Sequence, residues 1–291
     1  MDKGLTIIIP VYNEEKAILP LLRQIDSVFK DHRFEYEIIV VDDASTDNTP
    51  VALKLVNDKK IRVITHGNNK GYGASLKTGF KNSSYEYIAI IDGDGSYPGD
   101  IIPHLFDELF RQSSDMAVGA RAGRTVEMGI LWKFSKYLLR KLAEYLSGKE
   151  IPDLNSGLRI IKKYFFNKFL IFLPDKFSIT TTLTLFLLSN NCKIIYVPVD
   201  YYKRKGKSKI KPLRDILAFL RPVFKTAMFF SPLKIFLPTS LFFIFISFCL
   251  FGISVFLNKE MYAVSIAFFA GGISLLTAGF LKKIMHKPQT L

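Results

Sequence analysis

Two long apolar runs near the end of the chain limit most strongly what it can fold into. They cover residues 235–257 and 261–281, which are 23 and 21 residues without a charged side chain. Each run is close to the ~20 residues that a helix needs to cross a bilayer. Only three residues, 258–260, separate the runs, so they predict a tight transmembrane hairpin. Two buried core helices are the alternative, which the length of the runs and their lack of charge disfavour.

Basic residues flank the predicted hairpin on both sides. Lys225 and Lys234 precede the first run, and Lys282, Lys283 and Lys287 follow the second. By the positive-inside tendency, both ends of the hairpin lie in the cytoplasm. We therefore expect an integral membrane protein with two spans and a basic cytoplasmic tail, formed by residues 232–291. The hairpin could also mediate a homo-oligomer.

The first 120 residues alternate between short apolar runs and stretches of helical spacing. The runs that predict strands lie at 5–11, 36–42, 61–65, 87–92 and 116–119. Helices are predicted between them at about 14–29, 71–80 and 101–110, with a further helix that begins at 47–50. Strands that alternate with crossover helices form a mostly parallel sheet with helices on both faces. The fold class is therefore predicted to be α/β, with a doubly wound sheet in a catalytic domain of residues 1–210.

The positive charge of the chain, +14 in total, is concentrated in its middle. Residues 1–120 carry a net charge of −5, residues 121–231 one of +15, and residues 232–291 one of +4. This distribution predicts an anionic partner for the middle segment, namely a lipid phosphate or an acidic membrane surface. It argues against nucleic acid, because the basic residues flank membrane segments and the first domain is acidic.

Two stretches of the middle segment have an apolar stripe and a basic stripe at helical spacing. One spans about 129–147, and the other is a juxtamembrane helix within 211–231. We expect both to lie in the membrane interface, with packing against the sheet as the alternative for the first. Residues 193–199 predict an edge strand, because Pro198 would interrupt the ladder of a central strand.

Asp92 and Asp94 follow a buried apolar strand and are separated by a single glycine. Open α/β sheets bind ligands at the carboxyl ends of their strands. Two hard oxygen ligands at that edge suit Mg²⁺ or Mn²⁺, which binds through one or two carboxylates and the phosphates of a substrate. Considered alone, the same residues could also form a simple Asp-Gly turn.

Three further polar clusters also follow predicted strands. They are residues 10–14 after the first strand, 42–47 after the second and 67–75 after the third. Each could be an ordinary turn or helix cap, but four such clusters would meet at one edge of a parallel sheet. The glycine spacing in 67–73 fits neither a P-loop nor a dinucleotide-binding motif, which disfavours ATPases and nicotinamide enzymes.

These clusters together resemble glycosyltransferase family 2, which has the GT-A fold. The resemblance rests on Pro-Val-Tyr-Asn-Glu at 10–14, Val-Val-Asp-Asp-Ala-Ser-Thr-Asp at 40–47, Asn-Lys-Gly-Tyr-Gly-Ala at 69–74 and Ile-Asp-Gly-Asp-Gly at 91–95. A catalytic domain followed by amphipathic helices and a membrane hairpin is similar to the polyprenyl-phosphate (dolichyl-phosphate) subgroup of that family. The motifs cover about residues 4–210.

The resemblance implies a donor site for a nucleotide sugar at the sheet edge. In that site the base and ribose would be held by Pro10, Tyr12, Glu14 and Asp42, with Asp43, Lys70 and Gly71 contributing from the next two loops. Asp92 would lie against the ribose or the metal-bound diphosphate. Asp94 would be the main metal ligand and a catalytic residue.

The resemblance also implies an acceptor site. Arg121 would bind the acceptor phosphate and be catalytic, and Lys133 and Ser135 lie where the family has further phosphate contacts. Asp153 begins an acceptor-side loop. A basic loop at 202–209 contains Arg204 and Lys207 and would close over the phosphate, although such runs are often only solvated surface.

Two features depart from the pattern of the family. Ser96 stands where the dolichyl-phosphate mannosyltransferases usually have glutamine, two residues after the second carboxylate. The chain also contains no Gln-x-x-Arg-Trp motif, which argues against a processive polysaccharide synthase.

The predicted function is metal-dependent, inverting transfer of one sugar from a UDP- or GDP-sugar to polyprenyl or dolichyl phosphate at the cytoplasmic membrane face. An ionised phosphate needs no general base, which agrees with the absence of any of the four histidines from these motifs. A hydroxyl acceptor would need a base, for which Asp153 is the candidate. A non-catalytic membrane scaffold that binds sugar nucleotides is a third possibility.

Overall fold

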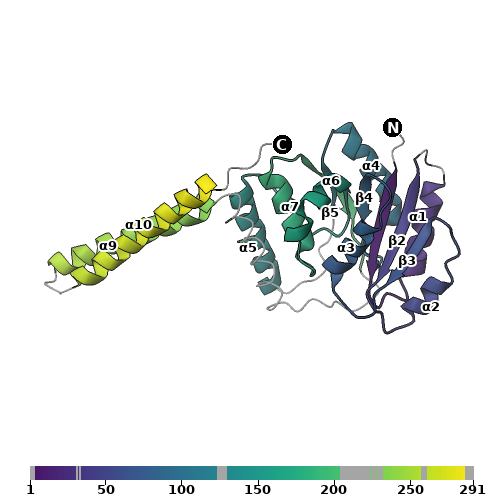
Figure 1. Cartoon of the computed structure of the whole chain (residues 1–291), viewed down its shortest axis with the longest axis horizontal. Coiled ribbons are helices and arrows are strands. Elements are labelled where there is room, and N and C mark those ends of the chain that lie inside the picture. Colours follow the sequence, from purple (N-terminus) through teal and green to yellow (C-terminus); the bar gives the residue numbers. More distant parts are fainter. Residues whose placement is uncertain are drawn as a thin grey trace.

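The computed structural model describes residues 4–30, 32, 34–122, 130–203, 224, 228, 232–256 and 261–285. Figure 1 shows an α/β domain from which a hairpin of two long helices extends. The α/β domain has a layered hydrophobic core, whereas the described residues of the helical hairpin form none of their own. The predicted juxtamembrane helix lies outside the described residues except for Phe224 and Met228, both of which are helical.

The described strands form one seven-stranded sheet in the order β3-β2-β1-β4-β6-β5-β7. Their bounds are β1 Leu5–Val11, β2 Tyr36–Asp42, β3 Ile61–Thr65, β4 Tyr87–Ile90, β5 Met116–Ala122, β6 Arg159–Lys162 and β7 Ile194–Asp200. Only β6 runs antiparallel to its neighbours, β4 and β5. The mostly parallel α/β sheet is thus confirmed, and so is the edge position of β7.

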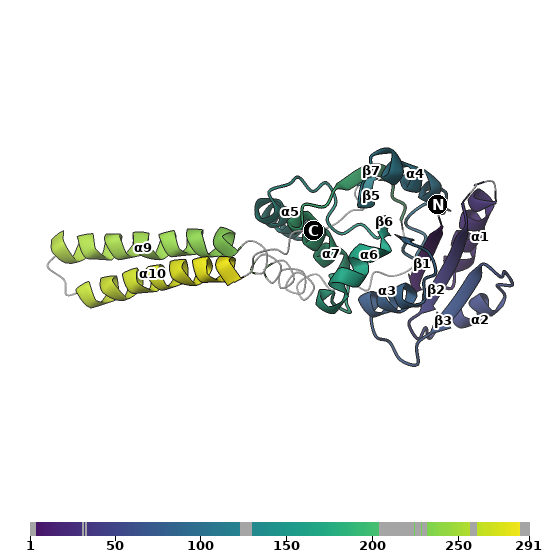
Figure 2. The same ribbon diagram turned by 45° about the horizontal axis from the view of Figure 1, so that its top comes forward.

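Helices cover both faces of the sheet (Figure 2). The helices of the domain are α1 Ile18–Phe29, α2 Thr49–Lys54, α3 Tyr72–Lys81, α4 Ile102–Arg111, α5 Ile130–Ser147, α6 Lys163–Phe169 and α7 Ile179–Ser189, with 3-10 turns at Gly99–Ile101 and Leu170–Phe172. Ile7 and Ile9 of β1 belong to the core on the side of α1 and α4, and Ile8 belongs to the core on the side of α3, α6 and α7. Because successive strand residues point to opposite faces and both faces are covered, the strand is fully buried and apolar except for Thr6, whose hydroxyl donates to Glu37 at 2.8 Å.

Helix α7 has no exposed face: all of its residues except Ser189 are buried. It lies between the core under α3 and α6 and a third apolar cluster formed with α5, which includes Leu139, Leu146 and Leu185. Two of its threonine hydroxyls are satisfied within the helix, since Thr182 Oγ1 donates to the Ser178 carbonyl at 2.8 Å and Thr184 Oγ1 to the Thr180 carbonyl at 2.9 Å. Thr181 Oγ1 instead donates to Asn155 Oδ1. This allows a polar residue type in a buried helix.

The hairpin consists of α9 Pro232–Phe256 and α10 Tyr262–Met285, which agree with the predicted spans to within a few residues. Both are long and apolar enough to cross a membrane, and only 17% of each apolar stretch is buried in the structure. That exposure argues against buried core helices. The two helices contact each other through small residues, with Ser247 Oγ donating to the Ser265 carbonyl at 2.8 Å and Ser265 Oγ to the Ser247 carbonyl at 2.9 Å. Small residues that allow close approach are typical of helix pairs in membranes.

One lysine joins the hairpin to the domain. Lys234 Nζ, in the first turn of α9, donates to the carbonyls of Tyr145 at 3.0 Å and Leu146 at 2.9 Å. These carbonyls lie in the last turn of α5, where no N–H of the same helix is left to bond to them. The helix dipole also favours a positive charge at this end. The hydroxyl of Tyr145 donates in return to the Lys234 carbonyl at 3.2 Å.

Candidate active site

A pocket of about 400 Å³ opens at the carboxyl edge of the sheet. Its walls come from the ends of β1, β2 and β4, from the loop before α3, and from the segments before β6, before α7 and after β7. The lining residues include Pro10, Tyr12, Glu14, Asp43, Asn69, Gly71, Tyr72, Ser75, Asp92, Asp94, Arg121, Asn155, Gly157, Lys176, Phe177, Thr180 and Tyr201. The four polar clusters therefore do meet in one place, as the parallel sheet requires.

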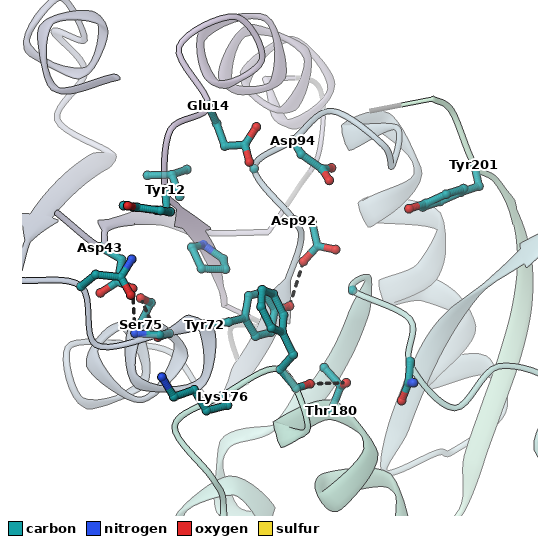
Figure 3. A pocket seen from close by; sticks show the side chains of 18 of the residues that line it. Tyr12, Glu14, Asp43, Tyr72, Ser75, Asp92, Asp94, Lys176, Thr180 and Tyr201 are labelled. Carbon is teal, nitrogen blue, oxygen red and sulfur yellow. Dashed lines mark hydrogen bonds between the residues drawn. The ribbon is translucent and has the colours of Figure 1, made fainter. Parts of the chain in front are cut away.

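Asp92 is held from two sides. The hydroxyl of Tyr72 donates to Asp92 Oδ1 at 2.8 Å, as Figure 3 shows. Burial, reinforced by the adjacent carboxylate, raises the pKa of Tyr72 well above its ordinary value, so the phenol stays protonated and remains a donor. On the other side lies Gly157, where an added Cβ would be 2.0 Å from Asp92 Oδ2. A side chain at position 157 would therefore displace the Asp92 carboxylate.

Asp94 is buried, and its Oδ1 accepts a hydrogen bond of 2.9 Å from the backbone N–H of Ser96. Gly93 allows the turn between the two carboxylates to pack on β1, because a Cβ there would lie 2.5 Å from Val11 Cγ1. Glu14, Asp92 and Asp94 lie along the same wall of the pocket (Figure 3). Among the described residues, no group of three Asp, Glu, His or Cys side chains could hold a metal ion alone. Two carboxylates such as Asp92 and Asp94, completed by the phosphates of a substrate, fit a hard divalent cation.

Ser96 does not extend this donor set. Its side chain is fully buried, its hydroxyl has no hydrogen-bond partner among the described residues, and it does not line the pocket. Its backbone is used instead: the N–H caps Asp94, and the carbonyl accepts from the N–H of Tyr202 at 2.9 Å. The residue thus positions Asp94 and connects that turn to the end of β7.

Arg121 enters the pocket from the end of β5 and is fixed by Asp153. Its Nε donates to Asp153 Oδ2 and its Nη2 to Asp153 Oδ1, each at 2.7 Å. The ring of Tyr201 lies 5.4 Å from the guanidinium carbon. Burial alone would raise the pKa of the Asp153 carboxyl, but the hydrogen bonds and charge of Arg121 hold that pKa below its usual range. Both partners are therefore charged.

A second arginine lies behind the pocket wall. Arg159, at the start of β6, is fully buried. Its Nη2 donates to the Ser156 carbonyl at 2.6 Å, and its Nη1 donates at 3.1 Å to both the Thr180 carbonyl and Thr184 Oγ1. It thereby ties the loop that carries Asn155 and Gly157 to the first turn of α7. No motif in the sequence predicts this role for Arg159.

The segment before α7 forms another wall of the pocket, which no motif in the sequence predicts. The ring of Phe177 stacks on that of Tyr72, with centroids 5.5 Å apart. The carbonyl of Asp175 accepts from the N–H of Ala74 at 3.2 Å, and its carboxylate pairs with Lys77 at 2.7 Å. An added Cβ at Gly73 would lie 2.3 Å from the carbonyl oxygen of Pro174, so the glycine loop makes this approach possible.

The predicted site residues divide into three groups. Those that line the pocket are Pro10, Tyr12, Glu14, Asp43, Gly71, Asp92, Asp94 and Arg121. Asp42, Lys70 and Asp153 do not line it: Asp42 is buried and accepts from the N–H of Ser45 at 3.0 Å, the Lys70 side chain is exposed, and Asp153 lies behind Arg121. Arg204 and Lys207 lie outside the described residues, as do the side chains of Lys133 and Ser135 in α5.

The sequence is similar to those of several known proteins. The family model for glycosyl transferase family 2 matches residues 6–170. A dolichol-phosphate mannosyltransferase of Pyrococcus furiosus is 29% identical over 230 residues, which are 76% of this chain and 62% of that protein. A UDP-N-acetylglucosamine–dolichyl-phosphate N-acetylglucosaminyltransferase of Methanococcus voltae is 31% identical over 183 residues, 56% of this chain and 70% of that protein. The chain thus spans less than two thirds of the length of the first relative.

Solved structures with the same fold include glucosyl-3-phosphoglycerate synthase from Mycobacterium tuberculosis. One of them, crystallised with Mn²⁺, uridine diphosphate and phosphoglyceric acid, superposes with a TM-score of 0.60 over 78% of each chain at 18% identity. This likeness confirms the predicted GT-A fold. With the sheet, the motifs and the match over residues 6–170 in agreement, the chain belongs to glycosyl transferase family 2.

Proposed function

We propose that this chain transfers one sugar, with inversion at the anomeric carbon, from a UDP- or GDP-sugar to a polyprenyl or dolichyl phosphate at the cytoplasmic membrane face. The observation that carries the proposal is that Asp92, Asp94 and the Arg121 guanidinium line one pocket at the sheet edge. A donor diphosphate and an acceptor phosphate are both anions, and such a pocket offers separate places for them.

The carboxylate wall would take the donor. Pro10, Tyr12, Asp43 and Gly71 line the part formed by the first three strand ends, which suits a nucleoside. Asp92 and Asp94, with Glu14 beside them, would hold Mg²⁺ or Mn²⁺, which would neutralise the charge that develops on the leaving nucleoside diphosphate. The Tyr72 hydroxyl and Gly157 keep the Asp92 carboxylate in one orientation toward the pocket.

Arg121 would align the acceptor. In the reaction a phosphate oxygen of the lipid forms a bond to the anomeric carbon, and the bond from that carbon to the nucleoside diphosphate breaks with its electron pair leaving on the diphosphate. The acceptor oxygen is already ionised near neutral pH, so no proton has to be removed. Arg121, fixed by Asp153 and Tyr201, would orient that phosphate and offset its charge as it approaches the donor.

The hairpin and α5 support a lipid acceptor. Lys234 and the Lys282–Lys283 pair lie at the same end of the antiparallel hairpin, the end next to the domain. By the positive-inside tendency this end is cytoplasmic. Tyr137 and Leu138 of α5 are 52% and 55% exposed, which suits an interfacial helix. The relatives with 29% and 31% identity are, by their names, transferases that use dolichol phosphate.

A hydroxyl acceptor is less well supported. It would require a general base, and the candidate, Asp153, lies behind Arg121 with both carboxylate oxygens bonded to that guanidinium. A carboxylate held in this way, with a lowered pKa, is a weak base and is not placed to reach a substrate.

Sugar transfer in membranes tests the proposal. Purified full-length protein in vesicles is given labelled UDP- and GDP-sugars with Mn²⁺, together with polyprenyl phosphate in one set and hydroxyl lipids in another. We expect label in the polyprenyl phosphate only, and none in chelator. Label in the hydroxyl lipids, or full transfer in chelator, would contradict the proposal.

A further inference from the structure

His66 is a buried histidine beside the donor wall, with no part in the function proposed above. It follows β3, and its ring lies between the loop after β2 and helix α3. Nδ1 lies 2.7 Å from Asp43 Oδ1, and Nε2 lies 2.9 Å from Thr78 Oγ1. Both ring nitrogens therefore have a partner, which fixes the ring plane.

The carboxylate that His66 contacts also holds the backbone of the glycine loop. Asp43 Oδ1 accepts from the N–H of Lys70 at 2.8 Å, and Asp43 Oδ2 accepts from the N–H of Gly71 at 2.7 Å. Asn69 and Gly71 line the pocket on either side of this contact. Gly71 has a φ of +106°, a conformation that side-chain-bearing residues rarely adopt. The shape of this loop therefore depends on the Asp43 carboxylate.

The roles of the ring nitrogens follow from the partners. Both Asp43 oxygens already accept backbone N–H groups, so the carboxylate acts as the acceptor toward the ring and Nδ1 is the donor. Thr78 has a hydroxyl that can donate or accept, so it serves Nε2 in either protonation state of the ring. The contact with Asp43 is thus permanent, and the three donors together leave the carboxylate a single orientation.

We infer that His66 is a positioning residue for donor binding: it orients Asp43, which in turn holds residues 69–71 in the shape that accepts the nucleotide. This inference rests on the proposed function, since it supposes that the pocket takes a nucleotide. His66 itself does not line the pocket. It would act through a series of contacts in which Thr78 touches His66, His66 touches Asp43, and Asp43 holds the loop.

Two substitutions of His66 separate its two contacts. The asparagine amide nitrogen is two bonds from Cβ, like Nδ1, and the glutamine amide nitrogen is three bonds from Cβ, like Nε2. His66→Asn can therefore still donate to Asp43, whereas His66→Gln keeps only the reach to Thr78. We expect His66→Gln to weaken binding of UDP or GDP with Mn²⁺ by about tenfold, the typical effect of one lost buried hydrogen bond, and His66→Asn to stay within about twofold of the wild type.

Equal affinities in the two variants, whether both like the wild type or both weakened alike, would overturn the inference. Hydrogen exchange of the Lys70 and Gly71 amides in the ligand-free protein gives a second measurement. Protection should fall in His66→Gln and persist in His66→Asn, and unchanged protection in His66→Gln would also overturn the inference. If the wild type binds neither nucleotide but the exchange differs as expected, the proposed function fails and the positioning role of His66 stands.

Discussion

Arg121 and Asp153 are joined by two hydrogen bonds of 2.7 Å. The Arg121 guanidinium lines the pocket, whereas the Asp153 carboxylate that fixes it does not. Such a bidentate pair sets both the position and the plane of the guanidinium. Asp153 thereby changes from a candidate base to a candidate positioning residue. The distinction can be measured, because a base and a positioning group respond differently to the same substitution.

Asp153→Asn should lower kcat/KM for polyprenyl phosphate by on the order of 100-fold, because a displacement of about 1 Å in a catalytic group costs that much. The KM for the donor should stay near its wild-type value. The pH–rate profile should keep its shape, since no titrating base is removed. Steady-state kinetics from about pH 3 to 9, a range that includes the region where Asp153 would titrate, measure all three. Loss of an acidic limb from the profile would show instead that Asp153 acts as a base.

The same pair predicts a pH dependence of stability. Because the pKa of Asp153 is lowered in the folded protein, the carboxylate stabilises the fold above its unfolded pKa of about 3.9, and this contribution is lost as the pH falls through the folded value. Breaking a pair of this kind costs roughly 3 kcal/mol. The Tm difference between the wild type and Asp153→Asn should therefore be large at neutral pH and shrink below about pH 4. A difference that is constant with pH would contradict the ion pair.

Asp94→Asn should remove metal-dependent nucleotide binding while the protein stays folded. The asparagine carbonyl can still accept from the N–H of Ser96, so the turn keeps its shape. The lost ligand charge should lower transfer by on the order of 100-fold or more. Thermal shift with and without Mn²⁺ and UDP or GDP is the measurement, with an unchanged Tm of the ligand-free variant as the control. A variant that is still stabilised by Mn²⁺ and nucleotide would exclude Asp94 as the main ligand.

Gly157→Ala tests the orientation of Asp92. The new methyl group would lie 2.0 Å from Asp92 Oδ2 and must displace the carboxylate. Transfer should fall by on the order of 100-fold. Gly67→Ala is the matched control, because a Cβ at Gly67 meets nothing within 4 Å, and it should retain nearly full activity. Equal activity in the two variants would mean that Asp92 need not be held in place.

The sequence predicted those parts of the fold that depend on a pattern within a few neighbouring residues. The strands β1, β2, β3 and β7 were predicted within one residue, because each is a short run rich in β-branched and apolar residues between polar turns. Asp92 and Asp94 were recognised because two carboxylates directly after such a run lie at the ligand-binding edge of a parallel sheet. The two long apolar helices of the hairpin were predicted for a similar reason, since length and absence of charge are local properties.

What the sequence did not reveal depends on contacts between distant segments. β6 has only four residues and becomes a strand by pairing with β4 and β5 on either side. Arg159 ends the stretch that begins at Asp153, for which the resemblance implies an acceptor-side loop, and its burial follows from carbonyls supplied by that loop and by α7. His66 lies outside every motif, and only the fold places it between Asp43 and Thr78. The residues that position the site were therefore harder to predict than those that line it.

The Lys234 contact has a consequence for how the protein would meet a lipid acceptor. Since α9 begins against the last turn of α5, and α5 packs on α7 through Leu139, Leu146 and Leu185, the pocket residue Thr180 is only two helices away from the hairpin. If the hairpin crosses a membrane, as proposed, the thickness of this stack of helices would set the height of the pocket above the lipid headgroups. A lipid phosphate would then have to rise by that height to meet the donor, and a flexible isoprenoid tail is the part of the proposed acceptor that could stretch to cover it.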